Sequence, residues 1–363
     1  MRLLIALDGL WNGGAERQMA QLTSSLPKSW TPHVVSLEDG PYRAVFEGLG
    51  IDVQVIQRRF RFDAASALKM WRKASAIAPD IVQSVGWMSS AAMIPFCRAH
   101  RTPLVNATIR QGRLPGRRAL LSKLCLSLSD AIVANSRAGL VAYRVPESAG
   151  HVVYNGFDPS RLAGAPSGNA AADSAKTVVI MAARMVPAKD WRSFLAVARA
   201  FSDEAAGWTF VAAGAGPERE RLLAEAEDLV RSGLVRFAEG GLEVLPLVAG
   251  AHIGLLLTEA RRAEGCSNSV MEYMACGLPV VCTESGGNPE LVEDGVTGLL
   301  VAPGEPGEAV EALRTLRDEP ARAREMGREG KRRLETRFTT ERMVRDFVSI
   351  YESLLRDREV TRT

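Results

Sequence analysis

The sequence predicts an α/β protein made of two doubly wound domains, each built on a parallel sheet with helices on both faces. Three observations predict this class. The chain has 363 residues, more than one ordinary hydrophobic core holds. Short apolar runs alternate with segments of helical periodicity, a pattern typical of βαβ units. One segment rich in Gly, Pro, Ala and Ser, residues 155–175, interrupts the alternation before it starts again.

The first half contains six apolar runs with the length of buried strands. The predicted strands are Leu3–Leu7, His33–Leu37, Val53–Ile56, Ile81–Gln83, Leu104–Ala107 and Ala131–Ala134. Helical segments lie between them, and they include Ala15–Ser25, Ala64–Ile77 and Ser89–Ala99. We expect this half to form one complete sheet.

The second half repeats the pattern. Its predicted strands are Val178–Ala182, Thr209–Ala212, Val235–Phe237, Ile253–Leu257, Val280–Cys282 and Gly298–Val301. Its predicted helices are Trp191–Phe201, Glu218–Val230, Leu242–Val248 and Asn268–Cys276. From Glu308 to Arg358 the chain is charged, helical in pattern and without a strand, so this tail must pack against domains already formed.

We therefore expect a first domain over residues 1–160, a linker over 161–176 and a second domain over 177–340. The last segment, 341–363, is expected to be a helix that packs back toward the first domain. Open parallel sheets bind ligands beyond the carboxyl ends of their strands. Two such sheets that face each other across a cleft would hold a ligand between the domains.

Composition limits the surroundings and the partners of the chain. Five cysteines without a CxxC pair argue against disulfides and zinc, and they indicate a reducing, cytoplasmic compartment. No apolar run approaches the ~20 residues that span a bilayer. Residues 1–155 carry 19 Lys and Arg against 10 Asp and Glu, a net charge of +9, whereas the remainder carries −6. This asymmetry indicates either an anionic partner of the first half, such as the inner face of a membrane, or only an uneven surface.

The densest chemical signal is the pair Glu264 and Glu272, which lies around the predicted start of a helix. Asn268 is a good N-cap residue, and the N–H groups of the first turn at Asn268, Ser269 and Val270 would form an anion site suited to a diphosphate. Glu272, one turn further on, could accept hydrogen bonds from ribose hydroxyls, and Glu264 could reach sugar hydroxyls. Two acids at this spacing could also merely complement the helix dipole.

The residues that follow give the acidic pair its meaning. Ala275, Gly277, Pro279 and Val280 complete a pattern, Glu-x7-Glu followed by Ala-x-Gly-x-Pro-Val, that resembles the retaining glycosyltransferases of family 4. The resemblance implies the GT-B fold, with two Rossmann-like domains. It also implies that Glu272 binds the ribose of a nucleotide sugar and that Glu264 lies beside the donor sugar and the reacting centre.

Arg184 and Lys189 follow the strand predicted at Val178–Ala182, at the spacing that the family shows. Both cations would contact the diphosphate of the donor. The negative charge of this leaving group grows as the glycosidic bond breaks, so cations placed there favour the transition state. We therefore expect Glu264, Arg184 and Lys189 to form the catalytic set. Asp190 stands where relatives usually carry Gly.

The first domain gives weaker signals. The resemblance places Gly13 and Gly14, which follow the first strand, near the phosphate and sugar of the donor. Many relatives carry His in the loop after the fourth strand, where this chain has Gln83. Trp87 could pack against the acceptor or the sugar, or could be an ordinary core residue. The remaining candidates are Arg110 and Arg113. They belong to a basic loop that could hold a phosphate-bearing acceptor, touch an anionic membrane or simply be solvated.

The resemblance as a whole implies a retaining, metal-independent glycosyltransferase that moves a sugar from a nucleotide-diphosphate sugar, with UDP as the expected nucleotide, to an acceptor hydroxyl. We expect no cofactor, because Arg184 and Lys189 would take the part of a metal. The expected acceptor is a glycan or a lipid-linked molecule in polysaccharide, lipopolysaccharide or other glycoconjugate synthesis; a nucleic-acid partner is not expected. Two alternatives are open: a non-catalytic sugar-nucleotide-binding protein and an epimerase of the same fold. A nicotinamide-dependent enzyme is disfavoured, since no complete Gly-x-Gly-x-x-Gly follows a strand.

Overall fold

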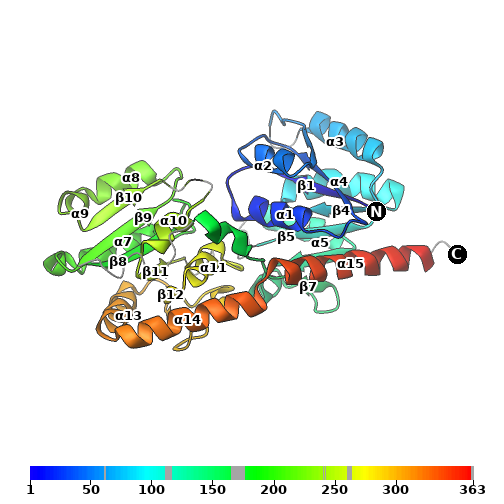
Figure 1. Ribbon diagram of the computed structural model, residues 1–363. Coiled ribbons are helices and arrows are strands. Elements are labelled where there is room, and N and C mark those ends of the chain that lie inside the picture. Colours follow the sequence, from blue (N-terminus) through cyan, green and yellow to red (C-terminus); the bar gives the residue numbers. More distant parts are fainter. Residues whose placement is uncertain are drawn as a thin grey trace. The chain divides into compact units, whose positions relative to one another are not determined.

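The chain forms two compact units in the computed structural model, which describes residues 1–60, 63–110, 117–164, 176–239, 241, 243–259 and 264–360 (Figure 1). The first unit contains Met1–Gly156 and Thr340–Thr363, and the second contains Phe157–Thr339. Residues 161–164, which we expected in a linker, therefore belong to the second unit. The rest of the expected linker, 165–175, lies outside the described residues.

The first unit is a parallel sheet of seven strands in the order β3-β2-β1-β4-β5-β6-β7. Its strands are β1 (Arg2–Leu7), β2 (Thr31–Ser36), β3 (Asp52–Val55), β4 (Ile81–Ser84), β5 (Leu104–Ile109), β6 (Ala131–Ala134) and β7 (Gly150–Val152). Its helices are α1 (Gly14–Ser24), α2 (Tyr42–Gly48), α3 (Ala64–Ile77), α4 (Trp87–His100), α5 (Arg117–Ser127), α6 (Arg137–Tyr143) and α15 (Thr340–Val360). The six strands predicted from the apolar runs are all present, and β7 is an additional edge strand.

Alternation along β1 shows how this sheet is buried on both faces. Leu3, Ile5 and Leu7 point to one face, where they pack with side chains of α1, α2 and α15. Leu4 and Ala6 point to the other face, which α3 and α4 cover. The C-terminal helix α15 is thus part of the core of the first unit.

The second unit is a parallel sheet of six strands in the order β10-β9-β8-β11-β12-β13. Its strands are β8 (Thr177–Ala182), β9 (Trp208–Ala213), β10 (Val235–Ala238), β11 (Ile253–Leu256), β12 (Val280–Thr283) and β13 (Gly298–Val301). Its helices are η1 (Pro159–Gly164), α7 (Trp191–Arg199), η2 (Ser202–Glu204), α8 (Arg219–Glu225), α9 (Glu227–Arg231), α10 (Leu245–Ala249), α11 (Asn268–Ala275), α12 (Asn288–Leu291), α13 (Pro306–Asp318) and α14 (Pro320–Arg337). The strand order reverses between β8 and β11, so a crevice is expected at their carboxyl ends.

Two predicted helices differ in the structure. The helix expected over Glu218–Val230 is divided into α8 and α9 at the buried residue Ala226. The helix expected over Leu242–Val248 begins only at Leu245, because Pro246 is best accommodated in a first turn. All five cysteines are free thiols in the structure. Among the described helices, none is long and apolar enough to cross a membrane.

Tyr273 of α11 forms hydrogen bonds to both β8 and β11, the two strands between which the strand order of the second sheet reverses. Its hydroxyl accepts a hydrogen bond from Ala182 N at 2.7 Å and donates one to Leu255 O at 3.1 Å. The side chain is fully buried, and a Cβ atom at Gly254 would lie 2.3 Å from its ring. The phenol thus replaces ladder bonds between β8 and β11 and fixes α11 over the crevice.

Replacing Tyr273 with Phe should lower the free energy of unfolding of the second unit by about 1–3 kcal/mol, because the change leaves a buried N–H and a buried C=O without their partner. Urea titration followed by circular dichroism would measure the change. An unchanged urea midpoint would mean that β8 and β11 satisfy these backbone groups without the hydroxyl.

Candidate active site

The helix that carries most of the predicted site begins at Asn268, as predicted, but its N-cap is the residue before. Ser267, not Asn268, is the N-cap of α11, and its Oγ accepts a long hydrogen bond of 3.5 Å from Val270 N. Asn268 is the first helical residue. Adjacent Ser and Asn are both good caps, and local preference does not rank them. The helix end that we predicted as an anion site is present, but the N–H of Val270 already has a partner.

Ser269, predicted to bind the donor, is engaged with the neighbouring strand. Its Oγ donates a hydrogen bond of 2.5 Å to Ala182 O at the end of β8. Together with the Tyr273 hydroxyl on Ala182 N, this bond fixes both backbone groups of one residue to α11. The loop that leaves β8 and carries Arg184 and Lys189 therefore starts from a rigid point.

Lys189 and Glu264 form an ion pair in the structure. The distance from Lys189 Nζ to Glu264 Oε1 is 2.5 Å, and the two side chains are 10% and 23% exposed. Lys189 is placed by an antiparallel bridge to Thr258, just after β11. The carbonyl of Glu264 accepts a hydrogen bond from Gly287 N at 2.9 Å. Two of the three predicted catalytic residues are thus in direct contact.

Asp190, which stands where relatives usually carry Gly, has a structural role at the start of α7. Its Oδ1 accepts a hydrogen bond from Ser193 N at 3.1 Å, and its Oδ2 accepts one from Ser193 Oγ at 2.6 Å. It is the N-cap of α7, a position that Asp satisfies well. The substitution strengthens the start of α7 and leaves Lys189 in place.

Glu272 is held by a cation that the sequence did not point to. Arg161 Nη2 lies 2.7 Å from Glu272 Oε1 and 2.9 Å from Glu243 Oε1, and Arg161 Nε donates a hydrogen bond of 3.1 Å to Glu243 Oε2. Burial alone would lower the pKa of Arg161, but the hydrogen bonds and charges of the two carboxylates outweigh it and raise that pKa. Glu272 is 3% exposed, and the guanidinium of Arg161 supplies a positive charge that compensates its carboxylate.

Arg184, the third predicted catalytic residue, is exposed, and within the described part of the chain its guanidinium forms no ion pair. Its carbonyl accepts a hydrogen bond from Trp191 Nε1 at 3.0 Å, which positions the backbone of the loop. An exposed cation in the same loop as the paired Lys189 can take up an anionic ligand at low desolvation cost.

Gly13 and Gly14 in the first unit start α1, with Gly13 as an extended N-cap. A Cβ atom at Gly13 would lie 2.4 Å from Glu16 Oε2, so a larger residue there would only have to displace the flexible Glu16 carboxylate. Trp87 starts α4, and its ring lies 5.7 Å from that of Tyr143. It is half-buried against the core around β5 and β6, which favours the core interpretation.

The remaining residues of the first unit are explained in part. Arg110 Nε donates a hydrogen bond of 3.3 Å to Ala107 O, and Arg113 lies outside the described residues. Gln83, which replaces the His of many relatives, is fully buried. It accepts a hydrogen bond from the Tyr351 hydroxyl of α15 and donates one to Met19 Sδ. Gln83 therefore links the C-terminal helix to the core and is not placed to contact a ligand.

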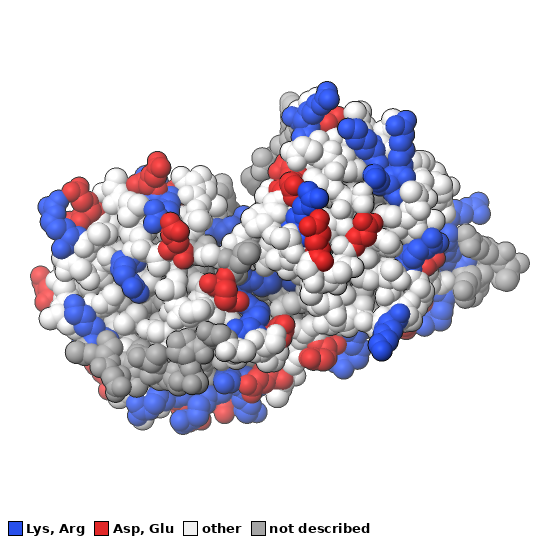
Figure 2. All heavy atoms as spheres, turned by 45° about the horizontal axis from the view of Figure 1, so that its top comes forward, with Lys and Arg blue, Asp and Glu red and all other residues white. Residues whose placement is uncertain are grey.

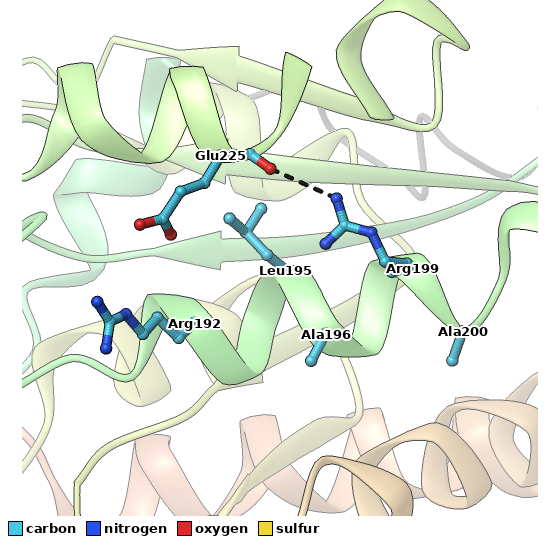
Figure 3. Close-up of a pocket in the computed structure, with 6 residues that line it drawn as sticks. All are labelled: Arg192, Leu195, Ala196, Arg199, Ala200 and Glu225. Atoms are coloured by element: carbon cyan, nitrogen blue, oxygen red, sulfur yellow. Dashed lines mark hydrogen bonds between the residues drawn. The ribbon is translucent and has the colours of Figure 1, made fainter. Parts of the chain in front are cut away.

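A cavity in the second unit lies between α7 and the end of α8 (Figure 3). It measures about 550 Å³ and is lined by Arg192, Leu195, Ala196, Arg199, Ala200 and Glu225. A smaller cavity of about 180 Å³ adjoins the predicted site, because Lys189 and Asp190 line it. Within the described part of the chain, no group of three or more His, Cys, Asp or Glu could hold a metal ion.

Comparison with known proteins matches both units. The family model for Glycosyltransferase Family 4 matches residues 12–161, and that for Glycosyl transferases group 1 matches residues 176–319. N-acetyl-alpha-D-glucosaminyl L-malate synthase of Bacillus anthracis is 34% identical over 145 residues, which are 40% of this chain and 37% of that protein. The lipopolysaccharide core biosynthesis mannosyltransferase LpsB of Rhizobium meliloti is 32% identical over 131 residues, 33% of this chain and 37% of that protein. The chain thus matches little more than a third of the length of these relatives.

A solved structure covers far more of the chain. The crystal structure of Anabaena Alr3699/HepE in complex with UDP aligns with 97% of this chain and 100% of that one, with a TM-score of 0.84. The sequences are 20% identical, so this likeness shows the fold alone.

Proposed function

Because the chain belongs to the glycosyl transferases of group 1, with a family 4 domain ahead of it and the GT-B fold, we propose that it transfers a sugar from a nucleoside-diphosphate sugar to an acceptor hydroxyl. The observation that carries this proposal is the contact between Lys189 and Glu264 in the same unit as Glu272. A cation for the diphosphate, a carboxylate for the sugar and a carboxylate for the ribose are the groups that such a donor requires.

In the proposed mechanism, Lys189 and Arg184 stabilise the departing diphosphate. The bond between the anomeric carbon and the phosphate oxygen breaks, and its electron pair goes to that oxygen. The acceptor oxygen forms the new bond on the same face, and its proton passes to the departing phosphate, so the anomeric configuration is retained. Lys189 is 90% buried, so its charge acts through a lower dielectric than water and stabilises the leaving group more strongly. This route requires no metal.

The pairing with Glu264 gives Lys189 a second part. In the absence of donor, the carboxylate neutralises the buried ammonium, which would otherwise be costly to keep charged. When the diphosphate arrives, Lys189 can contact both anions, and Glu264 is held at the side of the donor sugar. UDP is the nucleotide to test first, since a solved structure of the same fold contains it. The proposed acceptors are glycans or lipid-linked molecules in polysaccharide or other glycoconjugate synthesis.

Incubation of the purified chain with nucleotide sugars separates the proposal from its alternatives. A glycosyltransferase releases nucleoside diphosphate and does so faster when a suitable acceptor is present. A non-catalytic binding protein would bind the nucleotide sugar but release nothing. An epimerase would return a rearranged sugar in the absence of any acceptor. Anomeric analysis of the product by NMR would test retention.

We further propose that the first unit meets an anionic membrane through an exposed surface at α3, made of Phe60, Leu68, Lys69, Arg72 and Lys73. Phe60 and Leu68 are 63% and 51% exposed. Leu68 and the three cations are exposed on α3, and Phe60 precedes that helix in the chain. Figure 2 shows Lys and Arg side chains gathered over this part of the unit. Exposed apolar side chains among cations fit a lipid surface that offers negative headgroups and hydrocarbon.

Reversing the charges of this α3 surface with Lys69→Glu, Arg72→Glu and Lys73→Glu should lower binding to vesicles that contain phosphatidylglycerol by more than about tenfold, since each cation near such a surface contributes about 1 kcal/mol. Cosedimentation would measure it. The matched control reverses Arg328 and Arg332, which are exposed on α14 in the second unit. Equal binding of both variants, or equal binding to neutral vesicles, would contradict the proposal.

A further inference from the structure

We propose that Arg161 is a positioning residue for the nucleoside half of the donor. It would act by holding Glu272 and the start of α10 in a fixed arrangement before the donor arrives. This inference rests on the proposed function, because it assumes that Glu272 receives the ribose. Sequence patterns assign no part to Arg161, which lies in the segment that we expected to be a linker.

The geometry places Arg161 at the junction of three elements. It lies in η1, and its guanidinium reaches Glu272 in the second turn of α11 and Glu243 just before α10. Glu243 Oε1 also accepts hydrogen bonds from Val244 N at 3.0 Å and Leu245 N at 3.1 Å, which caps the start of α10. The Arg161 guanidinium therefore contacts both Glu272, the predicted ribose anchor, and Glu243, which stands at the beginning of α10.

Packing keeps the guanidinium in this position. Its side chain is 14% exposed, and its Cζ atom lies 5.3 Å from the centroid of the Phe157 ring, within the range of a cation–π contact. Glu272 is 4% exposed in its side chain. A carboxylate buried to this degree needs a partner to stay charged, and a charged, fixed carboxylate is the better acceptor for the two hydroxyls of a ribose.

The charge balance favours positioning over direct contact with the diphosphate. Arg161 already faces two carboxylates, at N–O distances of 2.7, 2.9 and 3.1 Å. Arg184 and Lys189 are the cations that follow β8, and Arg184 is the exposed one. The guanidinium thus donates its hydrogen bonds to side chains of the protein. Glu272 and Glu243 are already held in place before the donor binds, so binding loses less side-chain entropy.

The test compares nucleotides that share the nucleoside but differ in phosphate. For Arg161→Met, the dissociation constants of the nucleoside monophosphate and diphosphate should rise by the same factor, about tenfold or more, while turnover at saturating donor stays within about threefold. Titration calorimetry and steady-state kinetics give these values. Arg161→Lys, which keeps the charge without the planar fork, should fall between. Glu243→Gln, a change at a 42% exposed side chain, should weaken the binding of both nucleotides by a smaller factor.

A double-mutant cycle of Arg161→Met with Glu272→Gln decides whether Arg161 acts through Glu272. Strongly non-additive losses of affinity support the inference, whereas additive losses overturn it. A loss confined to the diphosphate would also overturn it, since it would make Arg161 a direct phosphate ligand, and so would unchanged affinity in both Arg161→Met and Glu243→Gln. If the wild-type chain binds no nucleotide at all, the proposed function fails first. Failure of the inference alone is recognised by a wild-type chain that binds and variants that bind equally well.

Discussion

Replacing Lys189 with alanine should lower turnover by about 10²–10³-fold with the chain still folded, the loss typical for removal of one preorganised group that stabilises transition-state charge. The ammonium is expected to act mainly as the diphosphate departs, so kcat should fall more than donor affinity. Its removal also leaves Glu264 without the cation that lies 2.5 Å from it. The rate of nucleoside-diphosphate release at saturating donor measures the effect.

Lys176→Ala is the matched control for this change. Lys176 belongs to the same unit but lies just before the amino end of β8, opposite to the end that carries the proposed site. Its variant should keep wild-type turnover. If Lys189→Ala kept it as well, the assignment of Lys189 to the leaving group would be wrong. Adding Glu264→Gln to Lys189→Ala should cost less than the product of the two single losses, because the two residues are in contact.

Replacing Glu272 with alanine should weaken donor binding by at least about 10–100-fold, since a single charge-assisted hydrogen bond to the ribose contributes roughly 1.5–3 kcal/mol. The ribose is remote from the breaking bond, so KM should rise while kcat changes little. Calorimetric titration with the nucleoside diphosphate and steady-state kinetics would both record the change.

The control for Glu272→Ala is Glu311→Ala, a change at a 75% exposed side chain of α13 that is paired with Arg314. That variant should bind the donor normally. A fall in kcat with unchanged KM for Glu272→Ala would place this carboxylate at the reacting centre and contradict its assignment to the ribose.

The fold could be predicted well because its signals are local. Buried parallel strands are short, continuous apolar runs, and those runs marked the strands of both sheets apart from the edge strand β7. The errors have physical causes. Helix α11 starts at Asn268 with Ser267 as its cap, because two adjacent residues were equally able to cap it. Helices α8 and α9 were predicted as one helix because the break between them, where Ala226 has φ −106° and ψ 12°, has no Gly or Pro to mark it in the sequence.

The site could be predicted only in part. Motif spacing predicted Lys189, Glu264 and Glu272 as site residues, but it could not reveal which charged side chains would contact each other. Arg161 precedes Glu272 by more than a hundred positions and sits beside a stretch with the composition of a linker. No local sequence pattern pairs Arg161 with Glu272. A buried carboxylate needs a cation nearby, but the burial of Glu272 is known only from the structure. The contact of Gln83 was also not predictable from local sequence. Gln83 lies where relatives carry His, but its side chain is buried and bonded to Tyr351.

The central claim, that this chain binds a nucleoside-diphosphate sugar at the site of Lys189, Glu264 and Glu272, is tested most directly by a thermal-shift screen against UDP, GDP, ADP and their sugars, run in parallel on wild type and Glu272→Ala. A ligand that binds only the folded chain stabilises it by about 2.7 kcal/mol at one hundred times its dissociation constant. We predict that one nucleotide and its sugars raise the Tm of wild type and raise that of Glu272→Ala clearly less at the same concentration. A folded wild-type chain whose Tm responds to none of them, or a variant that responds as wild type does, would contradict the claim.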